Sequence, residues 1–286
     1  MKVAFAGLGV MGFPMAGHLA KAGHDMAVFN RTAEKTQRWV AAHGGRAGAK
    51  VAEAAAGAEV FVLCVGNDDD VRQVVSQALP AMAPGGIVVD HTTTSAVVAR
   101  DMAALAIRDG RAFVDAPVSG GQAGAENGQL TIMCGGEKAA FDRVEPVIGA
   151  YAKAIRLMGG PGAGQLTKMV NQICIAGIVQ GLAEGLHFAK RAGLDPQAVY
   201  EAISKGAAQS WQMDNRWKTM SEGKFDFGFA VDWMRKDLGL VLDEAGRNAS
   251  ALDMTAMVDG FYSEVQALGG SRWDTSSLVA RLEKAR

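Results

Sequence analysis

The chain has 286 residues, of which 49% are hydrophobic and 21% charged, a globular composition with enough length for two domains. Its 29 Lys and Arg residues balance 30 Asp and Glu residues without a polybasic block, so we expect neither nucleic acid nor a membrane as a partner. Three widely separated cysteines, Cys64, Cys134 and Cys174, argue against a disulfide framework and favour a reducing, cytoplasmic location.

The first half of the chain alternates short apolar runs with helical patterns. The expected strands and helices, in chain order, are strand 2–6, helix 14–22, strand 26–29, helix 33–42, strand 60–65, helix 69–79, strand 87–90, helix 95–108 and strand 112–114. Such alternation is typical of a doubly wound parallel sheet of the Rossmann type. Further strands at 130–133 and 154–157, separated by a helix at 138–148, are expected to extend this sheet.

The pattern changes after the Gly159-Gly160-Pro161-Gly162 sequence, where only helical patterns follow. A long helix is expected over 163–191, with others near 196–205, 210–220, 229–246, 254–268 and 275–284. We therefore predict an α/β cofactor-binding domain over residues 1–162 and an all-α domain over 163–286, joined by the long helix. Asn171, Gln172, Gln180 and Glu184 interrupt its most apolar stretch, which predicts that it falls short of a membrane span.

A glycine motif follows the first expected strand. Gly7-Leu8-Gly9-Val10-Met11-Gly12 is a GxGxxG between a strand and a helix. In that context the first glycine permits a tight turn, the second lets a pyrophosphate approach the backbone, and the third allows the helix to pack on the strand. The motif predicts a dinucleotide cofactor; the alternative is a tight turn without a ligand.

The end of the second strand bears on the choice of cofactor. NAD-binding proteins usually carry Asp or Glu here, whereas this chain has Asn30, Arg31 and Thr32, followed by Lys35. A guanidinium, a hydroxyl and an ammonium favour a 2′-phosphate, so NADP(H) is the preferred cofactor and NAD(H) a possible one. The alternative is that Arg31 is only a solvated surface residue.

Two later segments carry groups suited to a small carboxylate substrate. In Asp115-Ala116-Pro117-Val118-Ser119-Gly120-Gly121, a hydroxyl and two glycine amides can converge on an anion, although the spacing also fits a plain turn. The other segment, 162–172 (GAGQLTKMVNQ), opens the long helix with Lys168 among apolar residues and with Asn171 and Gln172 on the same face. Burial lowers the pKa of an ammonium and makes it a usable general acid, although a lysine extended to the surface fits equally well.

The four segments GLGVMG, DAPVSGG, GAGQLTKMVNQ and Lys236-Asp237-Leu238, taken together and in this order, resemble the β-hydroxyacid dehydrogenase family, which also includes the larger 6-phosphogluconate dehydrogenases. The resemblance implies that Lys168 is the catalytic lysine, that Ser119, Gly120 and Gly121 hold the substrate carboxylate with Asn171 and Gln172 nearby, and that Lys236 lies near the cofactor. It further implies cofactor contacts for Thr93 and for Val65, Gly66 and Asn67. A Gln172 where the family often has a second asparagine is associated with its semialdehyde-reductase branches.

The resemblance implies an oxidoreductase that interconverts a short 3- or 4-hydroxy acid and its semialdehyde, of the glyoxylate, succinic semialdehyde, tartronate semialdehyde or 3-hydroxyisobutyrate type. It also implies a homodimer or homotetramer. The alternatives are an imine reductase of the same fold, against which Lys168 argues, and a non-catalytic NADP-binding module.

Several conspicuous residues receive plainer interpretations. The five histidines lack close ligand spacing, so no metal site is expected. The acidic run Asp68-Asp69-Asp70 is explained as complementing a helix dipole. Four residues at helical spacing are expected in the core: Trp211, Met213, Trp217 and Met220. One or two of the aromatic residues near Lys236 are expected to line a substrate cleft, and the candidates are Phe225, Phe227, Phe229 and Trp233.

Overall fold

The structure, a computed structural model, describes residues 1–284, so the last two residues of the expected second domain, 285 and 286, lie outside it. The chain divides into two compact units, Met1–Lys168 and Met169–Arg286, and each is described by itself. The long helix α8 (Ala163–Arg191) has the bounds expected from the sequence and runs through the division.

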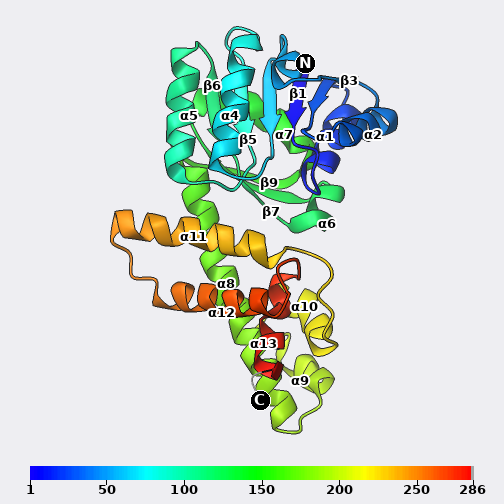
Figure 1. The fold of residues 1–286 in the computed structure, drawn as a ribbon, viewed down its shortest axis with the longest axis vertical. Coiled ribbons are helices and arrows are strands. Elements are labelled where there is room, and N and C mark those ends of the chain that lie inside the picture. The colour runs from blue at the N-terminus through cyan, green and yellow to red at the C-terminus, as the bar shows by residue number, and fades with distance from the viewer. Residues whose placement is uncertain (285–286) are drawn as a thin grey trace. The chain divides into compact units, whose positions relative to one another are not determined.

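The first unit is built on one nine-stranded sheet (Figure 1). Its strands are β1 (Lys2–Ala6), β2 (Asp25–Phe29), β3 (Arg46–Ala47), β4 (Val60–Leu63), β5 (Ile87–Asp90), β6 (Ala112–Asp115), β7 (Val118–Ser119), β8 (Leu130–Gly135) and β9 (Ala152–Gly159). The strand order is β3-β2-β1-β4-β5-β6-β8-β7, with β9 also paired to β8. Strands β1 to β6 are parallel, which confirms the doubly wound core.

The expected extension of the sheet is present, but its direction changes. Strand β8 is antiparallel to β6 and β7, and β9 runs parallel to β8. The sequence predicted no strand or helix in the segment between β6 and β8. This segment forms β7 and the short helix α6 (Gly121–Glu126), because pairing with β8 supplies hydrogen bonds that local propensity does not anticipate.

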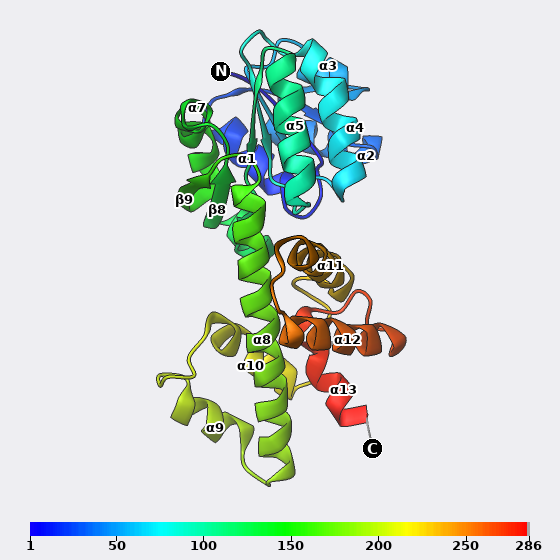
Figure 2. The same cartoon turned by 90° about the vertical axis from the view of Figure 1, so that its left-hand side faces the viewer.

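Helices cover both faces of the sheet, as Figure 2 shows for α4 and α5 on one side and α7 on the other. The helices are α1 (Gly12–Lys21), α2 (Ala33–His43), α3 (Val51–Ala55), α4 (Asp68–Ala78), α5 (Ala96–Arg108) and α7 (Lys138–Ile148), with 3-10 turns η1 (Leu79–Ala81) and η2 (Gly149–Tyr151). Alternate residues of β1 belong to different cores: Val3 and Phe5 pack with α1, α2 and α7, whereas Ala4 and Ala6 pack with α3, α4 and α5. Apolar residues on both faces of a strand are the mark of a buried parallel sheet.

In the second unit, the regular elements among the described residues are helices, joined by loops, and one isolated bridge pairs Ala230 with Asp274. After α8 come α9 (Pro196–Ile203), α10 (Trp211–Ser221), α11 (Val231–Asn248), α12 (Asp253–Ala267), η3 (Thr275–Ser277) and α13 (Leu278–Lys284). Met213, Trp217 and Met220 lie in its core, as expected, but Trp211 does not: its side chain is 58% exposed and stacks under the Arg216 guanidinium. Trp211 is the first residue of α10 and faces solvent, whereas Met213, two residues later, already lies in the core.

Helix α8 is the one helix among residues 1–284 that is long and apolar enough to cross a membrane, contrary to the expectation from its polar residues. Length and composition do not separate a membrane span from a long core helix. In this chain 44% of its most apolar window is buried, and Ala176, Val179 and Ala183 of α8 pack in the core of the second unit. The helix therefore serves as a core element of that unit.

Candidate functional site

In the glycine loop at the end of β1, two of the three glycines have a steric reason within the protein. Gly7 has φ +95°, and a Cβ there would lie 2.1 Å from the Cys64 carbonyl oxygen. A Cβ on Gly12 would lie 1.8 Å from the Gly7 carbonyl oxygen, so α1 can start here only with glycine. Gly9 is exposed, and no atom lies within 4 Å of its added Cβ. The loop is thus tightly packed on the protein side and open at Gly9, which fits a cradle for a pyrophosphate.

Asn30 connects this loop to the end of β2. Its Oδ1 accepts the Leu8 N–H at 2.9 Å, and its Nδ2 donates to the Thr32 carbonyl at 3.1 Å. Arg31, Thr32 and Lys35 are exposed beside it. The Arg31 guanidinium lies 3.1 Å from the Asp70 carboxylate, a partner that the sequence did not indicate. The predicted 2′-phosphate residues therefore border the glycine loop, with Asn30 fixing both segments.

The loops after β4 and β5 are tied to each other and to the start of α8. The Val65 N–H donates to Thr92 Oγ1 at 3.0 Å. The side-chain amide of Gln165, which is fully buried, donates to the Thr92 carbonyl at 2.7 Å and accepts the Thr94 N–H at 3.1 Å. Thr93 lies between these two anchored residues. Gln165 stands in the GAGQLTKMVNQ segment, but spacing alone did not reveal that it holds the Thr93 loop.

Asp115, at the end of β6, anchors the beginning of α8. Its buried carboxylate accepts the backbone N–H groups of Gly162 and Gln165 at 2.8 and 2.9 Å. These N–H groups at a helix start lack partners within the helix, so a carboxylate satisfies them and complements the dipole. Burial raises the pKa of Asp115 to about 6, although the backbone hydrogen bonds oppose that rise. A Cβ on Gly164 would lie 2.8 Å from the same carboxylate, which explains the glycine there.

Lys168 follows on the second turn of α8 and reaches the DAPVSGG segment. Its Nζ donates to the Val118 carbonyl at 2.9 Å, and the residue is 7% exposed. Val118 immediately precedes Ser119, which is half-buried, and the exposed Gly120 and Gly121, which open α6. The structure thus brings together the lysine and the loop that the sequence assigned to one site. A buried ammonium beside a hydroxyl and exposed amides can bind an anion and exchange a proton.

A buried histidine, His91, contacts the same DAPVSGG segment. The His91 ring lies 2.6 Å from the Ala116 carbonyl through Nδ1 and 2.7 Å from the Tyr151 hydroxyl through Nε2. A carbonyl oxygen only accepts, so Nδ1 carries the proton and Nε2 accepts from Tyr151. Burial lowers the pKa of His91 to about 4 and raises the pKa of Tyr151, so both are neutral at pH 7. From the sequence, His91 was considered only with the other histidines as a metal ligand, so this role was missed.

Three predicted residues of the second unit share a separate network. Gln172 is buried; its Nε2 donates to an Asp237 carboxylate oxygen at 2.7 Å, and its Oε1 accepts from Asn171 at 2.8 Å. The Lys236 ammonium lies 3.3 Å from Asp237 and 5.9 Å from the centre of the Trp233 ring. The amide of Gln172 is therefore used in holding Asp237 and Asn171. Of the four aromatic residues considered for a cleft, Phe225 is buried, whereas Phe227, Phe229 and Trp233 are 37–41% exposed.

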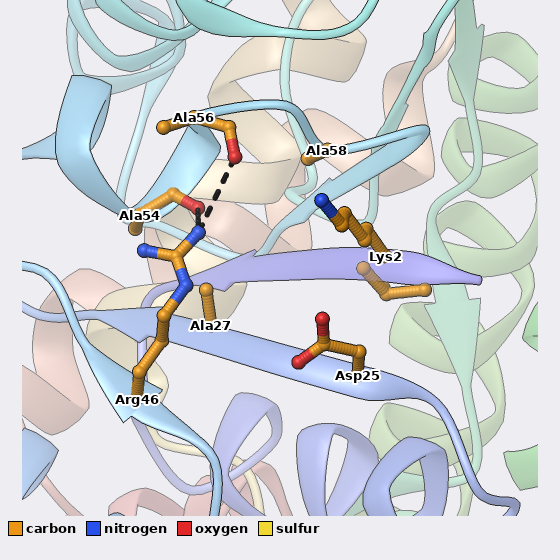
Figure 3. Close-up of a pocket in the computed structure, with 8 residues that line it drawn as sticks. Lys2, Asp25, Ala27, Arg46, Ala54, Ala56 and Ala58 are labelled. Carbon is orange, nitrogen blue, oxygen red and sulfur yellow. Dashed lines mark hydrogen bonds between the residues drawn. The ribbon is translucent and has the colours of Figure 1, made fainter.

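A cavity of about 300 Å³ lies in the first unit, lined by Lys2, Asp25, Arg46 and several alanines. Figure 3 shows how these side chains lie around it. The cavity lies at the amino ends of β1 and β2, whereas the glycine loop lies at the carboxyl end of β1. Ligands of open α/β sheets bind at the carboxyl ends of the strands. No cluster of three or more His, Cys, Asp or Glu side chains suited to a metal occurs within residues 1–284.

Comparisons with known proteins show the family to which the chain belongs. Residues 2–160 match the family model for the NAD binding domain of 6-phosphogluconate dehydrogenase, and residues 162–282 match the NAD-binding domain of NADP-dependent 3-hydroxyisobutyrate dehydrogenase. An uncharacterized oxidoreductase of Shewanella frigidimarina is 65% identical, with 100% of this chain and 99% of that protein covered. The 2-hydroxy-3-oxopropionate reductase of Escherichia coli is 35% identical over 99% of this chain and 97% of the relative.

Among solved structures, 3-hydroxyisobutyrate dehydrogenase of Mycobacterium tuberculosis with L-serine superimposes with a TM-score of 0.90 at 30% identity, covering 98% of both chains. Family models, relatives and structure thus agree along the whole chain. The protein belongs to the β-hydroxyacid dehydrogenase family and is an NAD(P)-dependent oxidoreductase acting on a hydroxy acid.

Proposed function

We propose that the protein is an NADP(H)-dependent enzyme that interconverts a short 3- or 4-hydroxy acid and its semialdehyde, with Lys168 as general acid and base. The observation that carries this proposal is the hydrogen bond from the buried Lys168 ammonium to Val118, next to Ser119. It puts the one buried lysine of residues 1–284 beside a loop suited to a carboxylate. The fit of Gly7, Gly9 and Gly12 to a pyrophosphate supports a dinucleotide at the same sheet edge.

The chain's own groups would act as follows. NADPH, when bound, supplies the hydride that reduces the carbonyl carbon. The Lys168 ammonium donates a proton to the carbonyl oxygen, so a hydroxyl forms rather than a free alkoxide. In the oxidation direction, neutral Lys168 takes the hydroxyl proton. Asp115 and Gln165 hold α8, and so Lys168, against the loops after β5 and β6. Such positioning typically lowers a barrier by several kcal/mol.

The substrate is a small carboxylate held by Ser119 and the amides of Gly120 and Gly121, with Asn171 as a further polar contact. Two relatives support this class by their names: one is a 2-hydroxy-3-oxopropionate reductase, and the other was solved with L-serine, a carboxylate with a 3-hydroxyl group. Gln172 stands where the family often has a second asparagine, and this difference favours a substrate of the semialdehyde-reductase type.

Steady-state kinetics test the proposal. Glyoxylate, succinic semialdehyde, tartronate semialdehyde, 3-hydroxyisobutyrate, serine and a cyclic imine would each be assayed with both cofactors. We expect turnover of at least one aldehyde acid with NADPH and none of the imine. Imine reduction without aldehyde reduction would make the protein an imine reductase, and nucleotide binding without any turnover would make it a binding module.

The preference for NADP rests on Asn30, Arg31, Thr32 and Lys35, which offer cations and no carboxylate at the end of β2. An aspartate at position 30 would accept hydrogen bonds from a ribose hydroxyl and repel a phosphate. Asn30→Asp is therefore expected to move the ratio of kcat/KM toward NADH. A ratio that stays unchanged would contradict this assignment.

We further propose a homodimer or homotetramer in the cytoplasm. Helix α8 carries exposed apolar side chains at Val170, Ile178 and Phe188, and Phe188 is 71% exposed. We expect these side chains to contact another copy of the chain. Light scattering of the wild type and of Phe188→Glu tests this: a dimer or larger assembly is expected to dissociate in the variant. A wild-type monomer would overturn it.

A further inference from the structure

The three acidic residues that open α4 make different contacts. Asp68 accepts the Ser95 N–H and hydroxyl at 3.0 and 2.5 Å, so it joins the start of α5. Asp69 is exposed. Asp70 accepts the Gly66 N–H at 3.2 Å and both terminal nitrogens of the Arg31 guanidinium, at 3.1 and 3.5 Å. A general complement to the helix dipole does not explain these specific partners of Asp70.

The bonds of Asp70 span the predicted cofactor loop. Arg31 follows β2 and Gly66 follows β4, and these two strands flank β1 in the sheet. The glycine loop begins where β1 ends. Asp70 therefore links the loops on either side of Gly7–Gly12, on the side where the adenosine of a dinucleotide would lie if the proposed function is correct.

The ion pair is poorly suited to stabilising the fold. The Arg31 side chain is 79% exposed, and exposed pairs contribute little to stability because water and salt screen them. The Asp70 side chain is only 17% exposed, so its carboxylate stays fixed while the guanidinium faces solvent. A guanidinium has five N–H donors, and the pair uses two of them, so the others can still meet a phosphate.

We propose that Asp70 is a specificity-determining residue that limits the preference for NADP over NAD, because its carboxylate shares the Arg31 guanidinium with the 2′-phosphate. NADP brings a doubly charged phosphate to Arg31, close to a fixed negative charge. NAD brings a neutral hydroxyl to the same place. The inference rests on the proposed NADP-binding function and goes beyond it by naming the residue that weakens the preference.

Asp70→Asn tests the proposal, because asparagine keeps an oxygen for the Gly66 N–H and loses the charge. Fluorescence titration of the purified protein gives Kd for NADPH and for NADH at low ionic strength. We expect Kd for NADPH to fall by roughly 3- to 10-fold, the size of a Coulomb term of about 1 kcal/mol in water, while Kd for NADH changes by less than about twofold. Raising the salt to about 0.5 M is expected to shrink the difference.

Asp69→Asn is the matched control, since it removes the same charge from the same helical turn without touching Arg31. We expect a much smaller shift in the NADPH to NADH ratio for this variant. Equal changes for both nucleotides in Asp70→Asn, or weaker NADPH binding, would overturn the proposal; the latter result would mean that Asp70 orients Arg31. Wild-type protein that binds neither nucleotide would refute the proposed function instead. Because both constants come from one variant, partial misfolding cancels in their ratio.

Discussion

The two ends of the parallel sheet in the first unit differ in what their polar side chains do. At the amino ends lies the cavity of Figure 3, where Arg46 donates to the carbonyls of Glu53, Ala54 and Ala56 within its own neighbourhood. At the carboxyl ends, Asn30, Gln165 and Asp115 each join loops that are distant in the chain. A cavity alone therefore does not mark the site. Polar side chains that fix several loops mark it better.

Removing the Lys168 ammonium, which lies near the carboxyl ends of the strands, is expected to have the largest effect on activity. In Lys168→Ala the proton donor is lost, so kcat falls by about 10²- to 10⁴-fold while Kd for NADPH changes little. Rapid kinetics and nucleotide titration measure the two quantities. Lys190→Ala, on the same helix and paired with Glu283, is the control that keeps its activity. A Lys168→Ala enzyme with nearly wild-type kcat would contradict the account.

Substitutions in the glycine loop can distinguish a glycine needed for packing from a glycine needed for ligand binding. In Gly12→Ala the new Cβ meets the Gly7 carbonyl, so we expect a loss of about 1–3 kcal/mol or more in the free energy of unfolding, together with weak NADPH binding. In Gly9→Ala the Cβ meets nothing, so unfolding changes by about 0.5 kcal/mol or less while NADPH binding is lost. Unchanged nucleotide affinity in Gly9→Ala would mean that the open space is not the pyrophosphate site.

Two buried titratable residues near the carboxyl ends of the strands, His91 and Asp115, are expected to change the stability of the fold with pH in opposite directions. Folding lowers the pKa of His91 to about 4, so the unfolded chain binds more protons and His91 makes stability rise between pH 4 and 6.5. Folding raises the pKa of Asp115 to about 6, so Asp115 stabilises the fold below about pH 4 and this contribution is lost as the pH rises through 6. The two contributions nearly cancel in the wild type.

Single variants are expected to expose each contribution. Relative to the wild type, Asp115→Asn gains stability as the pH rises from 4 to 6, and His91→Asn loses stability over pH 4 to 6.5, each by up to about 3 kcal/mol. Urea unfolding at each pH measures the differences. Variant curves that run parallel to the wild-type curve would show that these groups do not titrate as described.

The smallest effects on catalysis are expected at the amino ends of the strands. Lys2→Ala removes a side chain that lines the cavity, and we expect the free energy of unfolding to change by about 0.5 kcal/mol or less. Arg46→Ala breaks its hydrogen bonds to three carbonyls and costs about 1–3 kcal/mol. Neither variant is expected to change kcat/KM. A clear loss of kcat/KM in Lys2→Ala would show that the cavity is part of the active site.

Local patterns in the sequence predicted much of the fold. The bounds of β5, α7 and α8 were predicted to the residue, because strong periodicity and clear breakers agree there. β7 and α6 were missed, because glycines at 120, 121, 124 and 128 favour a loop and only the partner strand β8 makes the segment regular.

For the site, the sequence indicated the segments but not the bonds that organise them. Lys168 and Ser119 were assigned to one site by resemblance, and the hydrogen bond of Lys168 to Val118 brings the two segments together. The anchoring of α8 by Asp115 and the pairing of Arg31 with Asp70 join residues 47 and 39 positions apart. Neither contact follows from local propensity or residue spacing, because both contacts depend on which strands are neighbours in the sheet.

A crystal structure of the enzyme with NADP and a bound hydroxy acid tests the central claim most directly. We expect Lys168 Nζ to lie within about 3 Å of the substrate hydroxyl, on the same side as the reacting carbon of the nicotinamide. A substrate bound elsewhere, with that nitrogen still engaged only with protein groups or turned to solvent, would contradict it.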